Sequence, residues 1–311
     1  MLKTKGIHHI SSIVGHAQRN VDFYAGVLGL RLVKKTLNYD DKNHYHLYYG
    51  NKNGSNGLVT TFPMNNSIVG RIGDGQVGYA SYTVPKGSLQ FWKDRLNDFN
   101  IKSFEYIRFD LRRLRFQDLD GLEIELVESD LKDDNRWSFN GVKDSQAFDG
   151  IYGAALFSKR PNSTLKVLTD ILGYKITDQN HEYYQLKTNE SESRFIELSK
   201  NSQGHGQVAV GTVHHIAFEV ENEEIVAWRK LLIENGYRPT EIKDRNYFKS
   251  IYFREPGGIL FELATKGPGL LIDESIDSLG EKFIIPKHFK NNQQEIIERM
   301  QPVQVRMIDK L

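Results

Sequence analysis

Two histidines and one glutamate are the residues of this sequence best suited to hold a metal ion. His9 and His215 each end the histidine pair of a similar string, GIHHI or TVHHI, and Glu262 lies in the apolar string GILFELA. The chain has no cysteine, so histidine and carboxylate are its only strong metal ligands. Two histidines and one carboxylate make a facial triad that leaves positions open for water, substrate and dioxygen, as in non-haem Fe(II) oxygenases. Mn(II) fits the same ligands.

These three residues lie near opposite ends of a 311-residue chain, so the fold must bring them together. The order strand, helix, several strands occurs four times, which indicates an internal repeat. We expect four modules and a tail that packs on them, with a short helix near 292–300. Their expected bounds are residues 6–64, 76–130, 150–200 and 211–266 for modules 1 to 4, and 267–311 for the C-terminal arm.

Two alignments support the repeat at the level of single residues. LGLRL (28–32) resembles LGYKI (172–176), and LRFQDLDGLEIEL (114–126) resembles IYFREPGGILFEL (251–263) with a matching turn. Strand alternation alone does not produce the second match. The alternative is four unrelated α+β segments that share common turn chemistry.

The pairing of modules follows from which of them carry ligands at equivalent positions. On the first strands these positions are His9, Tyr79, Gly153 and His215, and on the last strands Thr61, Glu125, Glu197 and Glu262. A βαβββ unit makes half of a cup, so modules must pair to close a cavity. Only modules 1 and 4 together give the triad, with neutral Thr61 in the fourth place. We therefore predict an α+β fold of two cupped, barrel-like mixed β-domains, with modules 1 and 4 paired and modules 2 and 3 paired.

Each candidate also has an ordinary structural explanation. A single strand histidine is more often a core or surface residue than a ligand, but two HHI strings that open equivalent modules favour ligands. A buried, unpaired Glu262 would be costly, which favours a cation partner. Glu125 and Glu197 lie in similar strings in modules without histidines, so the glutamate pattern alone is a weak signal. A zinc hydrolase could use the same ligands, but the sequence has no HExxH segment.

Longer strings resemble one branch of the vicinal-oxygen-chelate superfamily, which includes the glyoxalases, bleomycin resistance proteins and extradiol dioxygenases. The strings are GIHHISSIVGHAQRNVDFYAGVLGLRLVKKTLNYDD, YHLYYGN, VHHIAFEV and RNYFKSIYFREPGGILFELAT, and the likeness covers nearly the whole chain. The branch is that of the hydroquinone-type ring-cleaving dioxygenases. The resemblance implies His9, His215 and Glu262 as iron ligands held by the first and fourth modules, and a pocket that uses His8, Ser11, His214, Arg245 and Tyr252.

Strand geometry bears on several of these roles. Alternation places His9 and Ser11 on one face, turns His8 to the other, and likewise opposes His214 to His215. Packing or hydrogen bonding behind the cup therefore competes with a catalytic role for His8 and His214. Ser11 replaces the threonine common in the branch and keeps the hydroxyl. Arg245 and Tyr252 can supply a cation and a phenol that stabilise negative charge, although surface arginines and core tyrosines are common.

The expected function is an Fe(II)-dependent enzyme that opens the ring of a hydroquinone with O2. Alternatives are a catechol-type extradiol dioxygenase, and a quinone- or drug-binding protein on the same fold that performs no turnover. A glyoxalase-like isomerase is a further alternative, but such sites generally fill the fourth ligand place. The expected partners are a small aromatic substrate and O2, and homo-oligomer formation stays open.

The composition argues against two other classes of partner. The net charge is +1, from 41 basic and 40 acidic residues, and no run of like charge marks a nucleic-acid surface. No stretch approaches the roughly 20 apolar residues of a membrane span, and the N-terminus lacks the apolar core of a signal peptide. We expect a soluble cytoplasmic protein without nucleic-acid or membrane partners.

Overall fold

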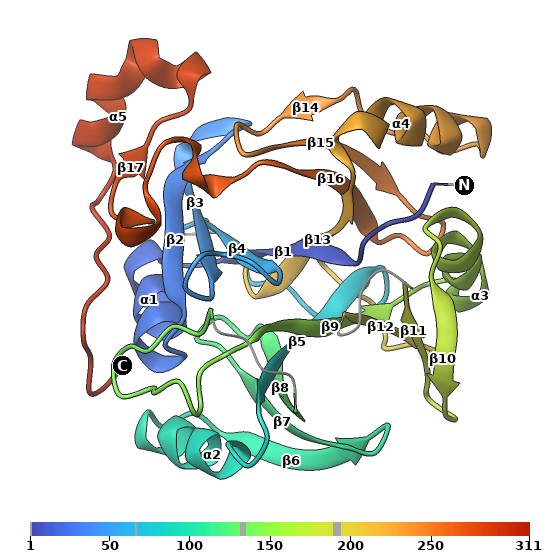
Figure 1. The fold of residues 1–311 in the computed structure, drawn as a ribbon, viewed down its shortest axis with the longest axis horizontal. Helices are drawn as coiled ribbons and strands as arrows, with labels where there is room; N and C mark the ends of the chain where they lie inside the picture. The colour runs from blue at the N-terminus through green and yellow to red at the C-terminus, as the bar shows by residue number, and fades with distance from the viewer. Residues whose placement is uncertain (1, 66, 131–134, 189–193) are drawn as a thin grey trace.

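The computed structural model describes residues 2–65, 67–130, 135–188 and 194–311, and the strands of these residues form two curved sheets (Figure 1). Residues 189–193, within expected module 3, lie outside the described part. The nine-stranded sheet has the order β14-β15-β16-β13-β1-β4-β3-β2-β17, and the eight-stranded sheet has the order β10-β11-β12-β9-β5-β8-β7-β6. The predicted α+β fold with modules 1 and 4 in one half and modules 2 and 3 in the other is confirmed.

The nine-stranded sheet combines strands from the two ends of the chain. Its members are β1 (Ile7–Val14), β2 (Arg31–Asn38), β3 (Asp41–Gly50), β4 (Leu58–Pro63), β13 (Thr212–Val220), β14 (Lys243–Asp244), β15 (Phe248–Arg254), β16 (Leu260–Pro268) and β17 (Phe283–Ile284). The eight-stranded sheet comes from the middle of the chain. Its members are β5 (Gln76–Pro85), β6 (Ser103–Arg108), β7 (Leu111–Gln117), β8 (Glu123–Ser129), β9 (Gly150–Phe157), β10 (Lys175–Gln179), β11 (Tyr183–Lys187) and β12 (Phe195–Ser199).

A helix follows the first strand of each module, and Figure 1 shows these helices at the periphery of the molecule. They are α1 (Ala17–Val21) with the π-helix η1 (Asp22–Val27), α2 (Leu89–Asp98), α3 (Pro161–Lys166) with the π-helix η2 (Val167–Ile171), and the 3₁₀ turn η3 (Asn222–Glu224) with α4 (Ile225–Glu234). The buried side chains of α2 and α4 recur at i, i+3 and i+7, with Trp92 and Trp228 at the centre, so one stripe of each helix faces the core. In the part of the chain that the structure describes, no helix is long and apolar enough to cross a membrane.

Each sheet is joined at its centre by the first strands of two modules. β1 pairs with β13, and β5 pairs with β9, both antiparallel. In the β1–β13 pairing, Ile7 lies opposite Phe218 but His9 lies opposite Ala217, so one residue of β1 is extra. Likewise, Ser11 lies opposite His215 but Ser12 lies opposite Val213, so one residue of β13 is extra. His8 and His214 are therefore the extra residues of two β-bulges, one on each strand. Gly78 in β5 and Tyr152 in β9 are the equivalent bulged residues of the other sheet.

The C-terminal tail lies against module 1. It contains the 3₁₀ segments η4 (Leu270–Ile272), η5 (Ile276–Ser278) and η6 (Lys287–Asn292) and the short helix α5 (Gln293–Arg299), which lies where the sequence predicts a helix. β17 extends the nine-stranded sheet by pairing parallel with β2. The buried Lys34 ammonium forms ion pairs with Asp273, at 2.5 Å, and with Glu274. The tail thus covers and neutralises a charge of the first module.

Candidate metal centre

Three ligand atoms from three adjacent strands meet inside the nine-stranded sheet. His9 Nε2 on β1 lies 3.2 Å from His215 Nε2 on β13, and Glu262 Oε2 on β16 lies 3.2 Å from the first and 2.8 Å from the second. The β1–β13 pairing brings the two histidines together across 206 residues of sequence. The parallel pairing of β16 with β13 places Glu262 opposite Ala217, two residues beyond His215. All three residues are buried.

The donor set fits a divalent metal ion. Neither oxygen of the buried Glu262 carboxylate has a hydrogen-bond partner, although both histidine rings lie within ion-pair distance of it. Ligands about 2.1 Å from an ion and at right angles to each other lie about 3.0 Å apart. The observed separations of 2.8 to 3.2 Å match one triangular face of an octahedron. Within the described residues, this is the single group of three or more His, Asp or Glu side chains with such convergence.

The site's electrostatics favour an ionised carboxylate. Burial by itself raises the pKa of the Glu262 carboxyl, but the facing His9 and His215 outweigh burial and hold that pKa well below its ordinary value. Burial lowers the pKa of His215, while Glu262 opposes that shift. A carboxylate and an unprotonated imidazole are the forms in which these side chains bind metals.

The bulged residues His8 and His214 each contact the ring of the neighbouring candidate ligand. His8 Nδ1 lies 2.8 Å from His9 Nδ1, and His214 Nδ1 lies 2.7 Å from His215 Nδ1. Simple alternation, which opposes His214 to His215, is wrong because the extra residue of a bulge interrupts the two-residue period. Both His214 and His215 line the same cavity, whereas His8 contacts the far side of the His9 ring. Burial lowers the pKa of His8 and of His214 to about 3, so both rings are neutral.

The fourth ligand place belongs to Thr60 and not to Thr61. β4 pairs with β1 so that Thr60 lies opposite Ser11, the second residue after His9. In the same way, Glu262 lies opposite Ala217, the second residue after His215. Thr61 turns to the helix side and donates a hydrogen bond to Asn20, at 2.7 Å. The prediction of Thr61 is wrong because the turn from Gly57 into β4 is one residue shorter than the equivalent turns in modules 2 and 4.

A cavity of about 430 Å³ opens over His9 and His215. Its walls are largely aromatic and apolar, with polar side chains among them. The lining residues are His9, Asn38, Tyr39, Asp40, His46, Tyr48, Phe62, Met64, His214, His215, Thr240, Lys243, Arg245, Phe248, Tyr252 and Leu260. This volume and lining suit a small aromatic molecule.

Arg245 and Tyr252, predicted pocket residues, lie together in this wall. The Tyr252 ring is 5.5 Å from the His215 ring, and the Arg245 guanidinium lies 5.4 Å from the Tyr252 ring centre. Arg245 is held by Asp40 of the β2–β3 turn at 2.8 Å, and Lys243 contacts the same carboxylate at 3.2 Å. Burial raises the pKa of Tyr252, so its hydroxyl keeps its hydrogen at neutral pH.

Ser11 lies behind the cavity wall and does not line it. Its hydroxyl contacts Thr60 Oγ1 at 2.6 Å, and Thr60 Oγ1 in turn contacts His46 Nε2 at 2.8 Å. His46 and Tyr48, which the sequence does not predict as site residues, both line the cavity. A usable signal existed, because His46 and Tyr48 alternate in YHLYYG and share one face of β3.

The eight-stranded sheet has arginines where the other sheet has its candidate metal centre. Glu125 and Glu197, the counterparts of Glu262 and Thr60, are both buried. Arg113 bridges them, 2.6 Å from Glu125 and 2.7 Å from Glu197, and Arg108 contacts both. Arg115, the counterpart of Tyr252, contacts Glu125 at 3.1 Å. Guanidinium groups thus neutralise the carboxylates of this cup.

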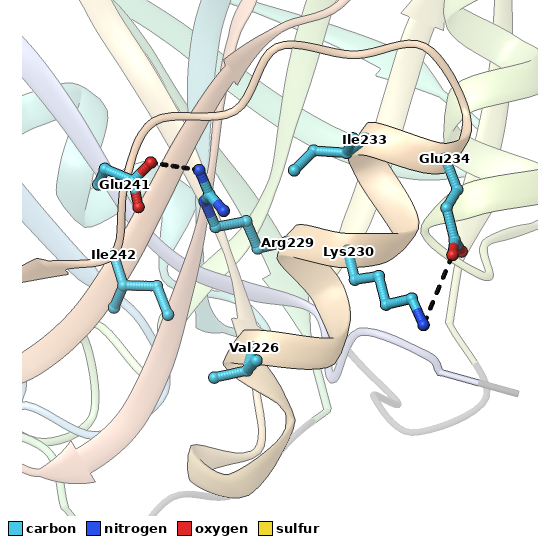
Figure 2. A pocket seen from close by; sticks show the side chains of 7 residues that line it. All are labelled: Val226, Arg229, Lys230, Ile233, Glu234, Glu241 and Ile242. Carbon is cyan, nitrogen blue, oxygen red and sulfur yellow. Dashed lines mark hydrogen bonds and ion pairs between the residues drawn. The ribbon is translucent and has the colours of Figure 1, made fainter.

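A separate groove of about 580 Å³ runs along the outer face of α4 (Figure 2). Its charged side chains are already paired, Arg229 with Glu241 and Lys230 with Glu234, and Val226 and Ile233 lie between them. None of the candidate site residues lines this groove.

Comparisons with known proteins agree with this fold. The model of the Glyoxalase/Bleomycin resistance protein/Dioxygenase superfamily matches residues 6–126 and 150–263. The chain is 43% identical to the candidate ring-cleaving dioxygenase MhqO of Bacillus subtilis strain 168, over 99% of both chains. It is 32% identical to the chlorohydroquinone/hydroquinone 1,2-dioxygenase of Sphingobium indicum, over 96% of both. A crystal structure of a candidate dioxygenase from Bacillus subtilis is 42% identical and superimposes with a TM-score of 0.96, covering 99% of this chain and 100% of that one.

Proposed function

Because the chain belongs to the Glyoxalase/Bleomycin resistance protein/Dioxygenase superfamily, we propose that it is a ring-cleaving dioxygenase that opens a hydroquinone with O2. His9, His215 and Glu262 would hold Fe(II), with Mn(II) as the other metal that suits these ligands. The observation that carries the proposal is the convergence of these three donor atoms at an aromatic-walled cavity, with a threonine in the fourth place.

Fe(II) in such a triad supplies the capacity to activate dioxygen and to bind a phenolic oxygen. The protein's own residues bind and orient the ring. Phe62 and Phe248 provide apolar walls, while Arg245 offsets negative charge on a substrate oxygen and Tyr252 can donate a hydrogen bond to it. The His214 ring lines the same cavity, so it would be the pocket histidine that exchanges a proton with the substrate.

The preference for a hydroquinone rests on the relative from Sphingobium indicum, whose name specifies that substrate. A catechol presents two neighbouring hydroxyls, and a hydroquinone presents them on opposite sides of the ring. Polar side chains from both module 1 and module 4 line the cavity, which suits the second arrangement. They include His46, Tyr48, Arg245 and Tyr252.

The test is oxygen consumption by protein that has been loaded with Fe(II) under anaerobic conditions. We expect uptake with hydroquinones, slower uptake with catechols, and none with His9→Ala, His215→Ala or Glu262→Ala. His205→Ala, at an exposed histidine outside the cavity, is the matched control and should retain full activity. Faster turnover of catechol would assign a catechol-type enzyme. Binding of hydroquinone without oxygen uptake would favour a binding protein, and normal turnover by any triad variant would exclude this metal site.

A further inference from the structure

One carboxylate of module 1 binds the cavity arginine of module 4. Asp40 lies in the turn between β2 and β3, and Arg245 lies between β14 and β15. Arg245 Nη2 donates a hydrogen bond to Asp40 Oδ2 at 2.8 Å, and both residues line the cavity. The Asp40 side chain is 58% exposed and that of Arg245 is 11% exposed, so the carboxylate lies nearer the surface. Among the described residues, Asp40 is the one carboxylate within ion-pair distance of this guanidinium.

The backbone around Arg245 is fixed, but this alone does not fix the guanidinium. The Arg245 N–H donates to the Phe248 carbonyl at 2.9 Å, and the Tyr247 N–H donates to the Arg245 carbonyl at 2.8 Å. An arginine side chain has several rotatable bonds between its backbone and its charge, so it loses much conformational entropy when it is ordered. Contacts at the end of the side chain must therefore hold the guanidinium in place.

The guanidinium has three such contacts. Its carbon lies 5.4 Å from the Tyr252 ring centre and 5.9 Å from the Tyr39 ring centre, and its hydrogen bond to Asp40 is the third. The rings limit how far the cation can move, whereas a charge-assisted hydrogen bond also fixes the direction of an N–H. Because a guanidinium has five N–H groups, the bond to Asp40 leaves others for a ligand.

The turn that carries Asp40 is itself held from two sides. The Asp40 N–H donates to the Asn38 side chain at 3.0 Å, which stabilises the turn locally. From the C-terminal tail, His288 Nε2 donates to the Tyr39 carbonyl at 3.0 Å. The carboxylate is therefore presented from a braced segment, and a bond to it can hold a longer and more mobile side chain.

Two cations share the Asp40 carboxylate, so a positive charge remains at this wall. Lys243 Nζ lies 3.2 and 3.3 Å from its two oxygens, in addition to the contact of Arg245. Burial by itself raises the pKa of Asp40, but Arg245 and Lys243 outweigh burial and hold that pKa below its ordinary value. Asp40 is thus ionised at neutral pH, and the three side chains together carry one net positive charge.

From this geometry we propose that Asp40 is a positioning residue that holds the Arg245 guanidinium in the cavity wall, and that it acts on the ligand through Arg245. The group that the positioned guanidinium recognises is an ionised phenolic oxygen of the bound ring. A cation held in place before the ligand arrives costs less to organise than a mobile one. Module 1 thereby shapes a ligand contact made by module 4. This inference rests on the proposed function, since it explains how an arginine of that site is placed.

The first experiment is a double-mutant cycle that measures ligand binding without turnover. Nitrohydroquinone, whose visible absorption changes when a hydroxyl ionises, is titrated anaerobically into iron-loaded wild type, Asp40→Ala, Arg245→Gln and the double variant. We expect binding about 10- to 100-fold weaker in Arg245→Gln, as for a lost hydrogen bond to a charged group. The loss in Asp40→Ala should be about 3- to 10-fold, since this carboxylate is partly exposed.

The double variant decides whether Asp40 acts through Arg245. Once the arginine is gone, removal of Asp40 should cost nothing more, so the double variant should bind no more weakly than Arg245→Gln. Losses that multiply in the double variant would overturn the inference, and so would unchanged binding in Asp40→Ala. Both results would leave the proposed function intact.

Two further variants separate the position of the arginine from charge and from the turn. Asp40→Asn keeps an acceptor oxygen without the charge, so its binding should stay within about 2-fold of wild type. Asp41→Ala is the matched control, because Asp41 is the next carboxylate along the chain but contacts His44, at 2.8 Å, and does not line the cavity. It should match wild type. A loss in Asp40→Asn or in Asp41→Ala as large as that in Asp40→Ala would overturn the inference.

The second experiment needs neither metal nor ligand. In ¹⁵N NMR spectra of metal-free protein, the Nε–H signal of Arg245, assigned by its absence from Arg245→Gln, should show a rigid side chain in wild type and Asp40→Asn. In Asp40→Ala it should show a mobile one. Equal rigidity in Asp40→Ala and wild type would overturn the inference. If wild type fails to bind the probe at all, the proposed function is contradicted, and the NMR result alone decides whether Asp40 holds Arg245.

Discussion

Thr60 occupies, in module 1, the place that Glu262 occupies in module 4. Each lies opposite the second residue after the candidate ligand histidine of its own module. Each also lies opposite a tyrosine of the strand on its other side. A carboxylate at both places would give four protein ligands. With threonine at one of them, one side of the candidate metal centre is left to the cavity.

Restoring a carboxylate at this place should strengthen metal retention and weaken catalysis. In Thr60→Glu the new side chain would point toward the triad, and a fourth protein ligand leaves fewer positions for substrate and dioxygen. We expect oxygen uptake with hydroquinone to fall at least about 10-fold while the ion resists a chelator for longer. Thr60→Gln, of the same size without the charge, should lose activity without gaining retention. Equal retention by Thr60→Glu and wild type would contradict the assigned geometry.

Metal binding should stabilise the folded protein through Glu262. A ligand present at 100 times its dissociation constant adds about 2.7 kcal/mol to the free energy of unfolding. Thermal unfolding under anaerobic conditions should therefore show a rise of several degrees when Fe(II) is added to wild type. Glu262→Gln should show almost none, whereas Glu241→Gln, on the surface, should behave as wild type. An equal rise in Glu262→Gln would mean that the ion binds elsewhere.

The arginine cluster of the eight-stranded sheet should be essential for stability. Arg113 is fully buried between Glu125 and Glu197, so Arg113→Met leaves two carboxylates with one cation fewer. We expect a loss of about 3–5 kcal/mol in the free energy of unfolding by urea, as for other broken buried ion pairs. Adding Glu197→Gln should recover part of that loss because it removes one of the excess negative charges. A double variant less stable than Arg113→Met would contradict this account.

Asp118 should make stability depend on pH in the acid to neutral range. Burial raises its pKa from 3.8 to about 7 in the folded protein, although backbone N–H groups of Asp120 and Leu122 donate to it. The folded state then holds a proton that the unfolded state releases, so this contribution to stability is complete below pH 3.8 and is lost as the pH rises toward 7. Urea unfolding between pH 4 and 8 should show this decline in wild type and a shallower one in Asp118→Asn. Identical slopes would contradict the shift.

The sequence predicts the module pairing because histidines stand on the first strands of only two modules. It does not predict the bulges at His8 and His214, since a bulge depends on the partner strand and leaves no spacing signal within β1 or β13. It misplaces the fourth ligand position because a turn one residue shorter shifts every later residue to the opposite face. His46 escapes notice for a related reason, since its partner Thr60 could not be placed before that turn was known.

The order of the strands also dictates when the candidate metal centre can exist during synthesis. Residues 76–199 of the eight-stranded sheet are contiguous, whereas the nine-stranded sheet closes only when β13 and β16 have joined β1. A nascent chain that has left the ribosome through module 3 exposes one side of β1, because its partner β13 is not yet made. Such a chain has His9 but neither His215 nor Glu262. Incomplete translation products therefore lack the full set of candidate ligands, and the last module supplies both the strands that close the sheet and two of the three candidate ligands.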